Sequence, residues 1–261
     1  MSVREKPSIY NAPSVYNQGG GDGTFEVEAG NIEQTLNFPP WLVPVEHIDL
    51  SDYAGTIFGI AGSWQLQLNN LDDLRCKFAY DPNKLLVNGE RLFSSVLSLG
   101  DGGSNKTIDF YVTQSKIVGF QYGNVQCSVQ NASFDTSSGM YLKYTGNLRR
   151  LYVVDGNGTS STYNSTSAYN TPKQGRWSLY GANQSPSYPF HGKIYYLAIT
   201  NGDTIRALFI PARAKNSANH QPYVVECVTG VVGINWSNNW STSGIVFGPD
   251  IDLSYISSYF V

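Results

Sequence analysis

The sequence predicts an all-β protein, a two-sheet antiparallel sandwich of the jelly-roll kind, and three observations lead to this fold class. From about residue 25 onward, short segments rich in β-branched and aromatic residues follow one another, separated by Gly, Asn, Asp and Ser. Helical periodicity is nearly absent, with residues 69–78 as a weak candidate. Sheets that have no helices to cover them must cover one another, and a sandwich achieves this.

The strands expected from these segments run through the whole chain. Alternation with a period of two is clearest in 25–29 and 64–68, which favours antiparallel sheets with one covered face. No period of 20 to 50 residues repeats, so a propeller or a solenoid is disfavoured. The expected strands are 24–29, 56–62, 64–70, 74–80, 84–89, 107–113, 116–123, 125–130, 140–146, 149–156, 176–181, 193–200, 204–210, 223–228 and 244–248.

Turn residues agree with this assignment. Asn-Gly or Asp-Gly pairs occur at 88–89, 155–156, 157–158 and 201–202, where primed hairpin turns need residues that tolerate positive φ. The last of them predicts a tight turn inside 190–215. Its first strand, 193–200, carries apolar or aromatic residues on both of its faces, as expected for a central strand covered on both sides. Pro211 is expected to end the second strand, where the loss of a backbone donor matters least.

Three parts of the chain are distinguished. Residues 1–23 hold a short repeat, PSIYN at 7–11 and PSVYN at 13–17, followed by a glycine run that predicts a flexible joint. The repeat is too short to bury its own apolar side chains, so it is expected to anchor the protein to a partner. Residues 24–89 are further strands of the same unit or a small collar, and 90–261 form the sandwich. The predicted anchoring residues are Ile9, Tyr10, Val15 and Tyr16.

Composition and charge exclude several classes of partner. The chain of 261 residues has a formal net charge of -3, and 14% of its residues are charged, against about a quarter in an average domain. We therefore expect no nucleic-acid partner. No apolar run of membrane-spanning length occurs, so no membrane partner is expected either. The first residues lack the apolar segment of a secretory signal, which predicts assembly in the cytoplasm. The cysteines, Cys76, Cys127 and Cys227, are expected to be free buried thiols.

Catalytic and metal-binding patterns are weak. The acid pairs, Asp72 with Asp73, Glu26 with Glu28, and Asp250 with Asp252, are interpreted as solvated acids in turns or near the chain end. His47, His191 and His220 have no metal-ligand spacing and no nucleophile elbow beside them. We expect no catalytic residue, no metal and no cofactor.

Carbohydrate binding has more support from the residue types. Flat aromatic rings stack on sugar faces, and amides bond hydroxyl groups both as donors and as acceptors. Residues 235–241, NWSNNWS, combine both kinds of side chain. The alternative is that the tryptophans are clamped inside the sandwich or in an oligomer interface. The candidate glycan-binding residues are Trp236, Trp240, Asn235, Asn238, Tyr188 and Trp177.

Several of these segments, taken in order, resemble a known family. WSLYG at 177–181, the stretch 189–215, YVVECVTGVVGINW at 223–236 and IVFG at 245–248 are similar to the closing part of the concanavalin A-like, laminin-G-type sandwich of tailed-phage structural proteins. FSSVLSLGDGG at 93–103 and LYVVDGNG at 151–158 resemble its earlier strands. The resemblance covers about 90–250. The sequence differs from the family pattern at one position. The family has Asp before the late Val-Thr-Gly, whereas this chain has Glu226 and Cys227 there. The Glu-x-Asp-x-x-Glu strand of glycoside hydrolases with this fold is missing.

The resemblance implies a bacteriophage virion protein without enzymatic activity. It would be a head fibre or capsid decoration, similar to the short head fibres of crAss-like phages, anchored through its N-terminus to a capsid or other virion protein. Its lectin-like domain would bind host or mucosal glycans as a homo-oligomer, a dimer or a trimer. A tail fibre or receptor-binding protein is one alternative, and a glycoside hydrolase or lyase on the same sandwich is another.

Overall fold

The computed structural model describes residues 24–29, 32–53, 60–68, 72–80, 93–100, 106–113, 118–122, 125–129, 140–145, 150–154, 160–164, 173–180, 190–216, 221–235 and 242–255. Over these residues nearly all regular structure is β-strand, apart from a single 3₁₀ turn at 253–255. No helix in this part of the chain is long and apolar enough to cross a membrane. The predicted all-β antiparallel sandwich is confirmed.

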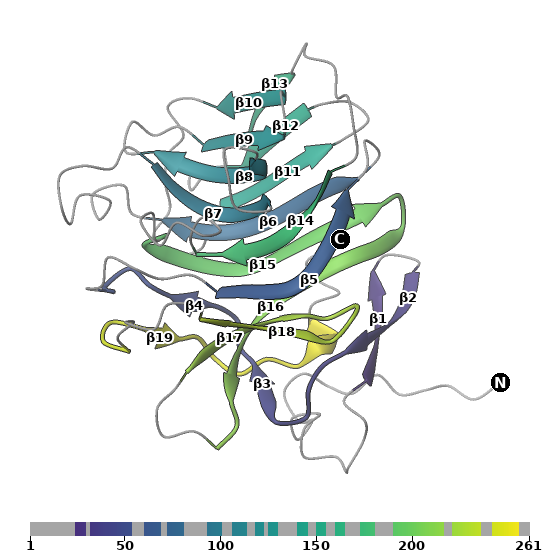
Figure 1. Ribbon diagram of the computed structural model, residues 1–261, viewed down its shortest axis with the longest axis vertical. Coiled ribbons are helices and arrows are strands. Elements are labelled where there is room, and N and C mark those ends of the chain that lie inside the picture. Colours follow the sequence, from purple (N-terminus) through teal and green to yellow (C-terminus); the bar gives the residue numbers. More distant parts are fainter. Residues whose placement is uncertain are drawn as a thin grey trace.

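The strands follow one another along the whole described chain (Figure 1). Their bounds are β1 (Thr24–Ala29), β2 (Ile32–Asn37), β3 (Leu42–Pro44), β4 (Ile48–Asp49), β5 (Ile60–Leu68), β6 (Asp73–Tyr80), β7 (Phe93–Gly100), β8 (Lys106–Thr113), β9 (Val118–Tyr122), β10 (Val125–Val129), β11 (Met140–Thr145), β12 (Arg150–Val154), β13 (Ser160–Asn164), β14 (Lys173–Leu179), β15 (Gly192–Asn201), β16 (Thr204–Ala214), β17 (Pro222–Glu226), β18 (Val231–Asn235) and β19 (Val246–Phe247).

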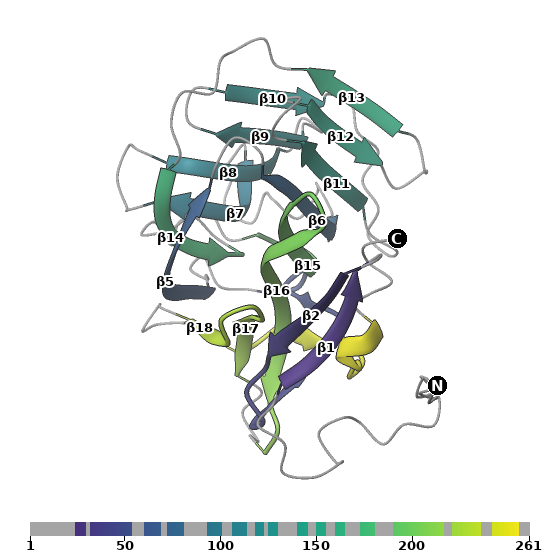
Figure 2. The same cartoon turned by 90° about the vertical axis from the view of Figure 1, so that its right-hand side faces the viewer.

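The pairings join most strands into one antiparallel series that folds over itself. One layer has the order β13–β12–β11–β6–β15–β16–β17, and β18 leads from it into the second layer, β5–β14–β7–β8–β9–β10. Figure 2 shows the two layers side by side, with β7, β8 and β14 on one side and β6, β11 and β12 on the other. The strands β5 and β6 are thus built into the same sandwich as the later strands, whereas β1 and β2 form a separate hairpin.

The hairpin of β15 and β16 forms as the sequence predicts. Asn201 pairs with Thr204 across the turn, and Gly202 has the positive φ of 55° that such a turn requires. Between its first and last residues, β15 is buried along nearly its whole length. It lies between β6 and β16 in the sheet, so the prediction of a central strand covered on both faces is confirmed.

The prediction that Pro211 ends the second strand is wrong, because β16 continues to Ala214. Pairing between β15 and β16 stops at Leu197 and Phe209. Beyond that point β4 replaces β16 as the partner of β15, and β3 replaces β15 as the partner of β16. Pro211 lies at this exchange of partners, where its carbonyl accepts a hydrogen bond from Val45 N at 3.0 Å. A missing backbone donor is tolerated because Pro211 faces this exchange of partners, while the ladder with β17 on the other side of β16 continues.

The apolar side chains of β15, β16 and β17 pack on both faces of their layer. Between the two layers of the sandwich lies an aromatic cluster that includes Trp177, Phe209, Tyr180 and Phe190. The opposite face carries a second cluster, which residues 36–42 and Leu253 cover from outside. Its buried members are Leu36, Phe38, Leu42, Ala79, Tyr195, Tyr196, Ala198, Ile205, Leu208, Ile210, Ala212, Val225, Cys227 and Leu253.

Candidate functional site

The structure removes Trp177 from the predicted glycan-binding residues. Its side chain is 0% exposed in β14 and packs edge-on against Phe209, with ring centroids 4.8 Å apart. Gly233 lies so close that an added Cβ would come within 2.3 Å of the indole Cη2 atom. A ring enclosed in this way cannot stack on a sugar, so the prediction for Trp177 is wrong. Its role is to fill the space between the two layers of the sandwich.

The other predicted contacts are not placed by the structure. Asn235 is the last residue of β18 and pairs with Ile60 of β5. Tyr188, Trp236, Asn238 and Trp240 lie outside the described residues, as do the predicted anchoring residues Ile9, Tyr10, Val15 and Tyr16. These assignments stay predictions.

An exposed group that the sequence did not single out lies at the edge of the outer apolar cluster. Tyr223 of β17 pairs directly with Ile234 of β18, which is 51% exposed. Trp41, 48% exposed, meets Tyr223 edge-on with ring centroids 5.3 Å apart. We call Trp41, Tyr223 and Ile234 the aromatic edge patch. Large apolar side chains that remain exposed side by side mark candidate binding surfaces.

The backbone holds Trp41 firmly although its ring is exposed. The residue follows two prolines, and a turn closes between Leu42 N and the Pro39 carbonyl at 3.1 Å. The Trp41 carbonyl accepts a hydrogen bond from Lys215 N at 3.0 Å, just beyond the end of β16. The ring is therefore displayed from a fixed position. A tryptophan placed directly after two prolines, FPPW at 38–41, is the sequence pattern that could have pointed to this site.

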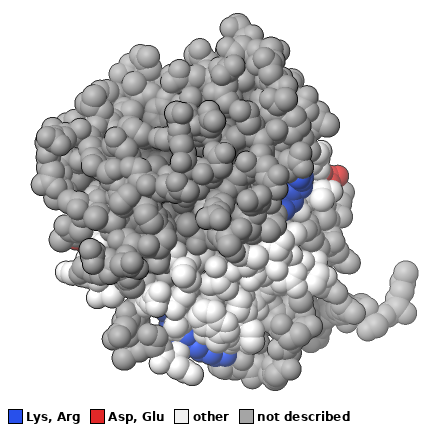
Figure 3. Space-filling model, viewed as in Figure 1, with Lys and Arg blue, Asp and Glu red and all other residues white. Residues whose placement is uncertain are grey.

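The residues next to the patch include the charged Arg213 and Lys215 as well as uncharged polar groups. The Tyr223 hydroxyl donates to Gln221 Oε1 at 3.0 Å, and partial burial raises the pKa of this tyrosine above its ordinary value. In Figure 3 most of the described surface in the lower half is uncharged, and a group of Lys or Arg atoms lies near its lower edge. Aromatic rings beside an amide and a hydroxyl suit a ligand with apolar faces and hydroxyl edges.

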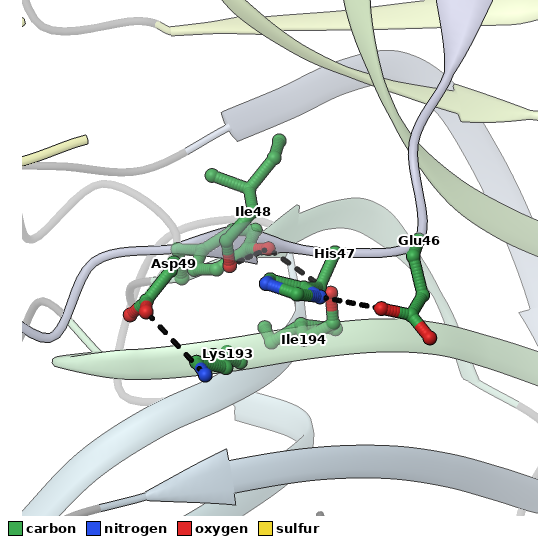
Figure 4. A network of polar contacts seen from close by, with 7 residues as sticks. Glu46, His47, Ile48, Asp49, Lys193 and Ile194 are labelled. Atoms are coloured by element: carbon green, nitrogen blue, oxygen red, sulfur yellow. Dashed lines mark hydrogen bonds and ion pairs between the residues drawn. The ribbon is translucent and has the colours of Figure 1, made fainter. Parts of the chain in front are cut away.

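A polar cluster forms where β4 crosses next to β15 (Figure 4). Lys193 Nζ lies 3.7 Å from Asp49 Oδ2, and the same carboxylate accepts a hydrogen bond from Ser51 N at 2.8 Å through its other oxygen. The buried Tyr180 hydroxyl lies 3.0 Å from the Ile48 carbonyl and 3.3 Å from the Ile194 carbonyl. Tyr180 therefore bridges the two neighbouring strands from the core side. These contacts fasten β4 to β15.

His47 belongs to the same cluster and is largely enclosed. Its Nδ1 lies 3.2 Å from Glu46 Oε2, and its ring packs against Tyr195 with centroids 5.1 Å apart. Burial lowers the pKa of His47 below its ordinary value, although the Glu46 carboxylate acts in the opposite direction. Gly248 lies so close that an added Cβ would come within 2.7 Å of the ring, and Gly248 N donates to the His47 carbonyl at 2.9 Å. The histidine thus supports the packing of 246–250 against β4.

Three acidic residues with described side chains serve the framework. Asp72 forms an ion pair with Arg206, and Asp250 binds Arg213 through both oxygens at 2.7 and 3.0 Å. Asp252 accepts a hydrogen bond from Ser254 N at 2.9 Å. No group of three or more His, Cys, Asp or Glu side chains within the described residues could hold a metal ion.

Glu226, where the chain departs from the family pattern, is fully buried and organises the turn between β17 and β18. Its carboxylate accepts hydrogen bonds from three backbone N–H groups, those of Leu208 at 3.1 Å and of Val228 and Thr229 at 3.0 Å each. It also accepts one from the Thr229 hydroxyl. Asn37 braces the turn from outside by donating Nδ2 to the Val228 carbonyl at 2.7 Å. The Glu226 carboxylate therefore stabilises the turn between β17 and β18.

The thiols with described side chains are free and buried, as predicted for Cys76 and Cys227. Burial raises the pKa of both thiols. Neither is a candidate nucleophile, because a reactive cysteine needs an accessible thiolate.

Comparison with known proteins does not assign the chain to a family. No protein-family model matches it, and no curated protein matches it. The full extracellular region of zebrafish Gpr126/Adgrg6 is a similar solved structure, at 15% identity and a TM-score of 0.43 over 60% of this chain and 21% of that one. A legume lectin-like domain from Entamoeba histolytica matches at 13% identity and a TM-score of 0.37, over 61% of this chain and 88% of that one. The alginate lyase AlgAT5 from Polysaccharide Lyase family 7 matches at 13% identity and a TM-score of 0.27, over 54% of this chain and 62% of that one. The chain spans about a fifth of that zebrafish extracellular region.

Proposed function

We propose that this protein is a carbohydrate-binding sandwich without enzymatic activity, and that the aromatic edge patch is its sugar-binding surface. The observation that carries the proposal is the position of Trp41, which is 48% exposed while its carbonyl accepts a hydrogen bond from Lys215 N and a turn from Pro39 to Leu42 encloses its backbone. A ring that is fixed before the ligand arrives loses little conformational freedom on binding. Tyr223 and Ile234 extend the same apolar surface.

The predicted glycan loop adjoins this surface along the chain. Ile234 is followed directly by Asn235, and NWSNNWS runs on to residue 241. Trp236, Asn238 and Trp240 would supply further rings and amides to a ligand that rests on Trp41. A single exposed aromatic stack contributes on the order of 1 kcal/mol beyond the area that it buries, so one site alone would be weak. Several copies in an oligomer would raise the effective affinity.

The test is binding to a panel of immobilised neutral glycans, followed by titration calorimetry with the best ligand. Trp41→Ala should weaken binding at least tenfold, because the stacking ring is removed while the fold is kept. Tyr255→Ala is the matched control, since Tyr255 is an exposed aromatic residue, 37% accessible, that is not part of the patch. Equal binding by Trp41→Ala and the unchanged protein would overturn the assignment of the patch.

Display on a phage particle is the setting proposed for this binding, on the strength of the sequence resemblance. The segment 7–17 would dock on a capsid protein and the glycine run would let the sandwich move. Immunogold labelling with an antibody to residues 90–250 separates the possibilities. Label over the capsid supports a head fibre or decoration protein, label at the tail tip supports a tail fibre, and particles without label refute the virion setting.

Catalysis is the rival from another class. If the protein released reducing sugar from a bound glycan, and Glu26→Gln or Glu28→Gln abolished this release, the protein would be a glycoside hydrolase and not a binding protein. Unsaturated products would instead indicate a lyase. The proposal expects neither activity.

A further inference from the structure

A short strand carries Trp41 to its exposed position. Trp41 comes directly before β3, which pairs with the end of β16 so that Leu42 lies opposite Ala214. The hydrogen bond from Lys215 N to the Trp41 carbonyl extends this pairing by one residue. Because β3 has only three residues, it forms few ladder bonds of its own. The position of the Trp41 ring therefore depends on what holds β3 against β16.

The other edge of β3 is covered by residues 249–251, which follow β19. Val45, the residue after β3, forms an antiparallel bridge with Asp250. Beside this bridge, Ile251 N donates to the Pro44 carbonyl at 3.0 Å. β3 is thus the middle one of three paired segments, with β16 along one edge and 249–251 along the other.

An ion pair joins the two outer segments across β3. Arg213 of β16 donates Nε to Asp250 Oδ1 at 3.0 Å and Nη2 to Asp250 Oδ2 at 2.7 Å. Arg213 pairs directly with Val43, so its side chain lies on the same face of the sheet as Val43 of β3. The bidentate pair therefore spans β3 and fastens its two neighbours to each other. We call Arg213 and Asp250 the β3 clasp.

The β3 clasp lies on the sheet face opposite the aromatic edge patch. Tyr223 pairs with Ala212, the residue directly before Arg213. Successive side chains of a strand point to opposite faces, so Arg213 points away from the face that carries Tyr223 and its partner Ile234. In the described part of the chain, its guanidinium bonds to Asp250 and to a backbone carbonyl of its own strand, but to no member of the patch. The clasp can therefore act on the patch only through the backbone of β3.

We propose that Arg213 is a positioning residue for the sugar-binding ring, because it clasps β3 together with Asp250 and so holds Trp41 in the orientation that stacks on the ligand. This inference rests on the proposed function for the role of Trp41. A ring that is held before binding spares the complex the cost of ordering it. One consequence is specific to this arrangement. The affinity for an uncharged sugar should fall when salt screens an ion pair that the sugar does not touch.

The binding test uses the full chain and neutral oligosaccharides of glucose, galactose and mannose, of which the tightest binder is titrated by calorimetry at low and high sodium chloride. Arg213→Gln and Asp250→Asn should each weaken binding about threefold, the effect of an exposed but bidentate ion pair. The double variant should bind no more weakly than either single one, because both remove the same interaction. High salt should weaken binding by the unchanged protein but not by Arg213→Gln. Lys193→Gln is the matched control and should bind normally, since its ion pair with Asp49 joins β15 to β4.

Hydrogen exchange in the ligand-free protein tests the clasp without any sugar. The amide of Lys215 donates to the Trp41 carbonyl, so its exchange rate reports how firmly β3 is held against β16. This amide should exchange about threefold faster in Arg213→Gln, in proportion to the loss of the ion pair. The amide of Phe190, which donates to the Tyr180 carbonyl next to β14, should keep its rate.

Three results would overturn the inference. The first is unchanged binding and unchanged Lys215 exchange in both Arg213→Gln and Asp250→Asn. The second is weaker binding by Arg213→Gln with normal binding by Asp250→Asn, which would show that Arg213 contacts the sugar itself. The third is equal acceleration of Lys215 and Phe190 exchange, which would indicate a general loss of stability.

Failure of the proposed function would look different. If the unchanged protein bound none of the neutral oligosaccharides, the role of the clasp in binding would be refuted with the proposed function, while the Lys215 exchange rate would still show whether the clasp holds β3. If Arg213→Gln did not fold, Asp250→Asn would give the same tests, because it removes the same ion pair at the more exposed residue.

Discussion

Replacement of Glu226 by alanine should destabilise the protein more than any change to an exposed acid. The substitution removes the acceptor of three backbone N–H groups and one hydroxyl around the turn at 227–230. Leu208 is fully buried, so its N–H would be left without a partner at about 1–3 kcal/mol. Val228 and Thr229 are more accessible, so water can replace part of the hydrogen bonding that their N–H groups lose. Each of these two N–H groups should therefore cost roughly 1 kcal/mol of stability. The sum is about 4 kcal/mol.

Chemical and thermal unfolding would measure this effect. A loss of about 4 kcal/mol corresponds to a fall in Tm of roughly 10 °C for a chain of this size. Glu226→Gln keeps one acceptor oxygen and should lose about half as much. Glu46→Ala is the control, because that carboxylate is 30% exposed and pairs only with His47 among the ion pairs described, which predicts less than about 1 kcal/mol. If Glu226→Ala unfolds no more easily than Glu46→Ala, the turn does not depend on the carboxylate and the reasoning is refuted.

Three further predictions concern packing, pH and thiol chemistry. Gly233→Ala would place a Cβ 2.3 Å from the Trp177 ring and should destabilise the fold by about 1–3 kcal/mol, and an unchanged urea midpoint would contradict this contact. Burial lowers the pKa of His47, so below about pH 6.5 the unfolded chain takes up a proton that the folded chain does not, and stability falls as pH drops until the folded pKa is passed. His47→Gln should flatten this part of the curve of urea midpoint against pH, and an identical slope would refute the assignment. Cys76 and Cys227, whose pKa values burial raises, should react with a thiol reagent only on unfolding, so that rapid labelling of either in the native protein would show an open site.

The fold class and the hairpin of β15 and β16 could be predicted because their causes are local. Alternation, β-branched residues and an Asn-Gly turn are all contained in a few neighbouring residues. The continuation of β16 past Pro211 could not be predicted in the same way. It depends on β3, a segment more than 150 residues earlier in the chain, which takes over as the partner of β16. Only the pairing register between these distant strands shows that β16 continues past Pro211.

The site was harder to predict than the fold, again for physical reasons. Trp177 and Trp41 are the same residue type, yet Trp177 lies between the layers and Trp41 faces solvent. Burial depends on which strand lies across from each ring, and the sequence does not specify this.

The central position of β15 also bears on how the chain folds as it is synthesised. Its partners β6 and β4 precede it by more than a hundred residues, so most of the chain must be made before the middle of the layer can close. Contacts of such long range slow folding, because a large loop must be ordered before any of them forms. Until residue 201 has left the ribosome, β6 lacks its β15 neighbour and exposes an unpaired edge. Fragments that stop before β15 should therefore aggregate, and β15 would act as the closing element of the whole sandwich.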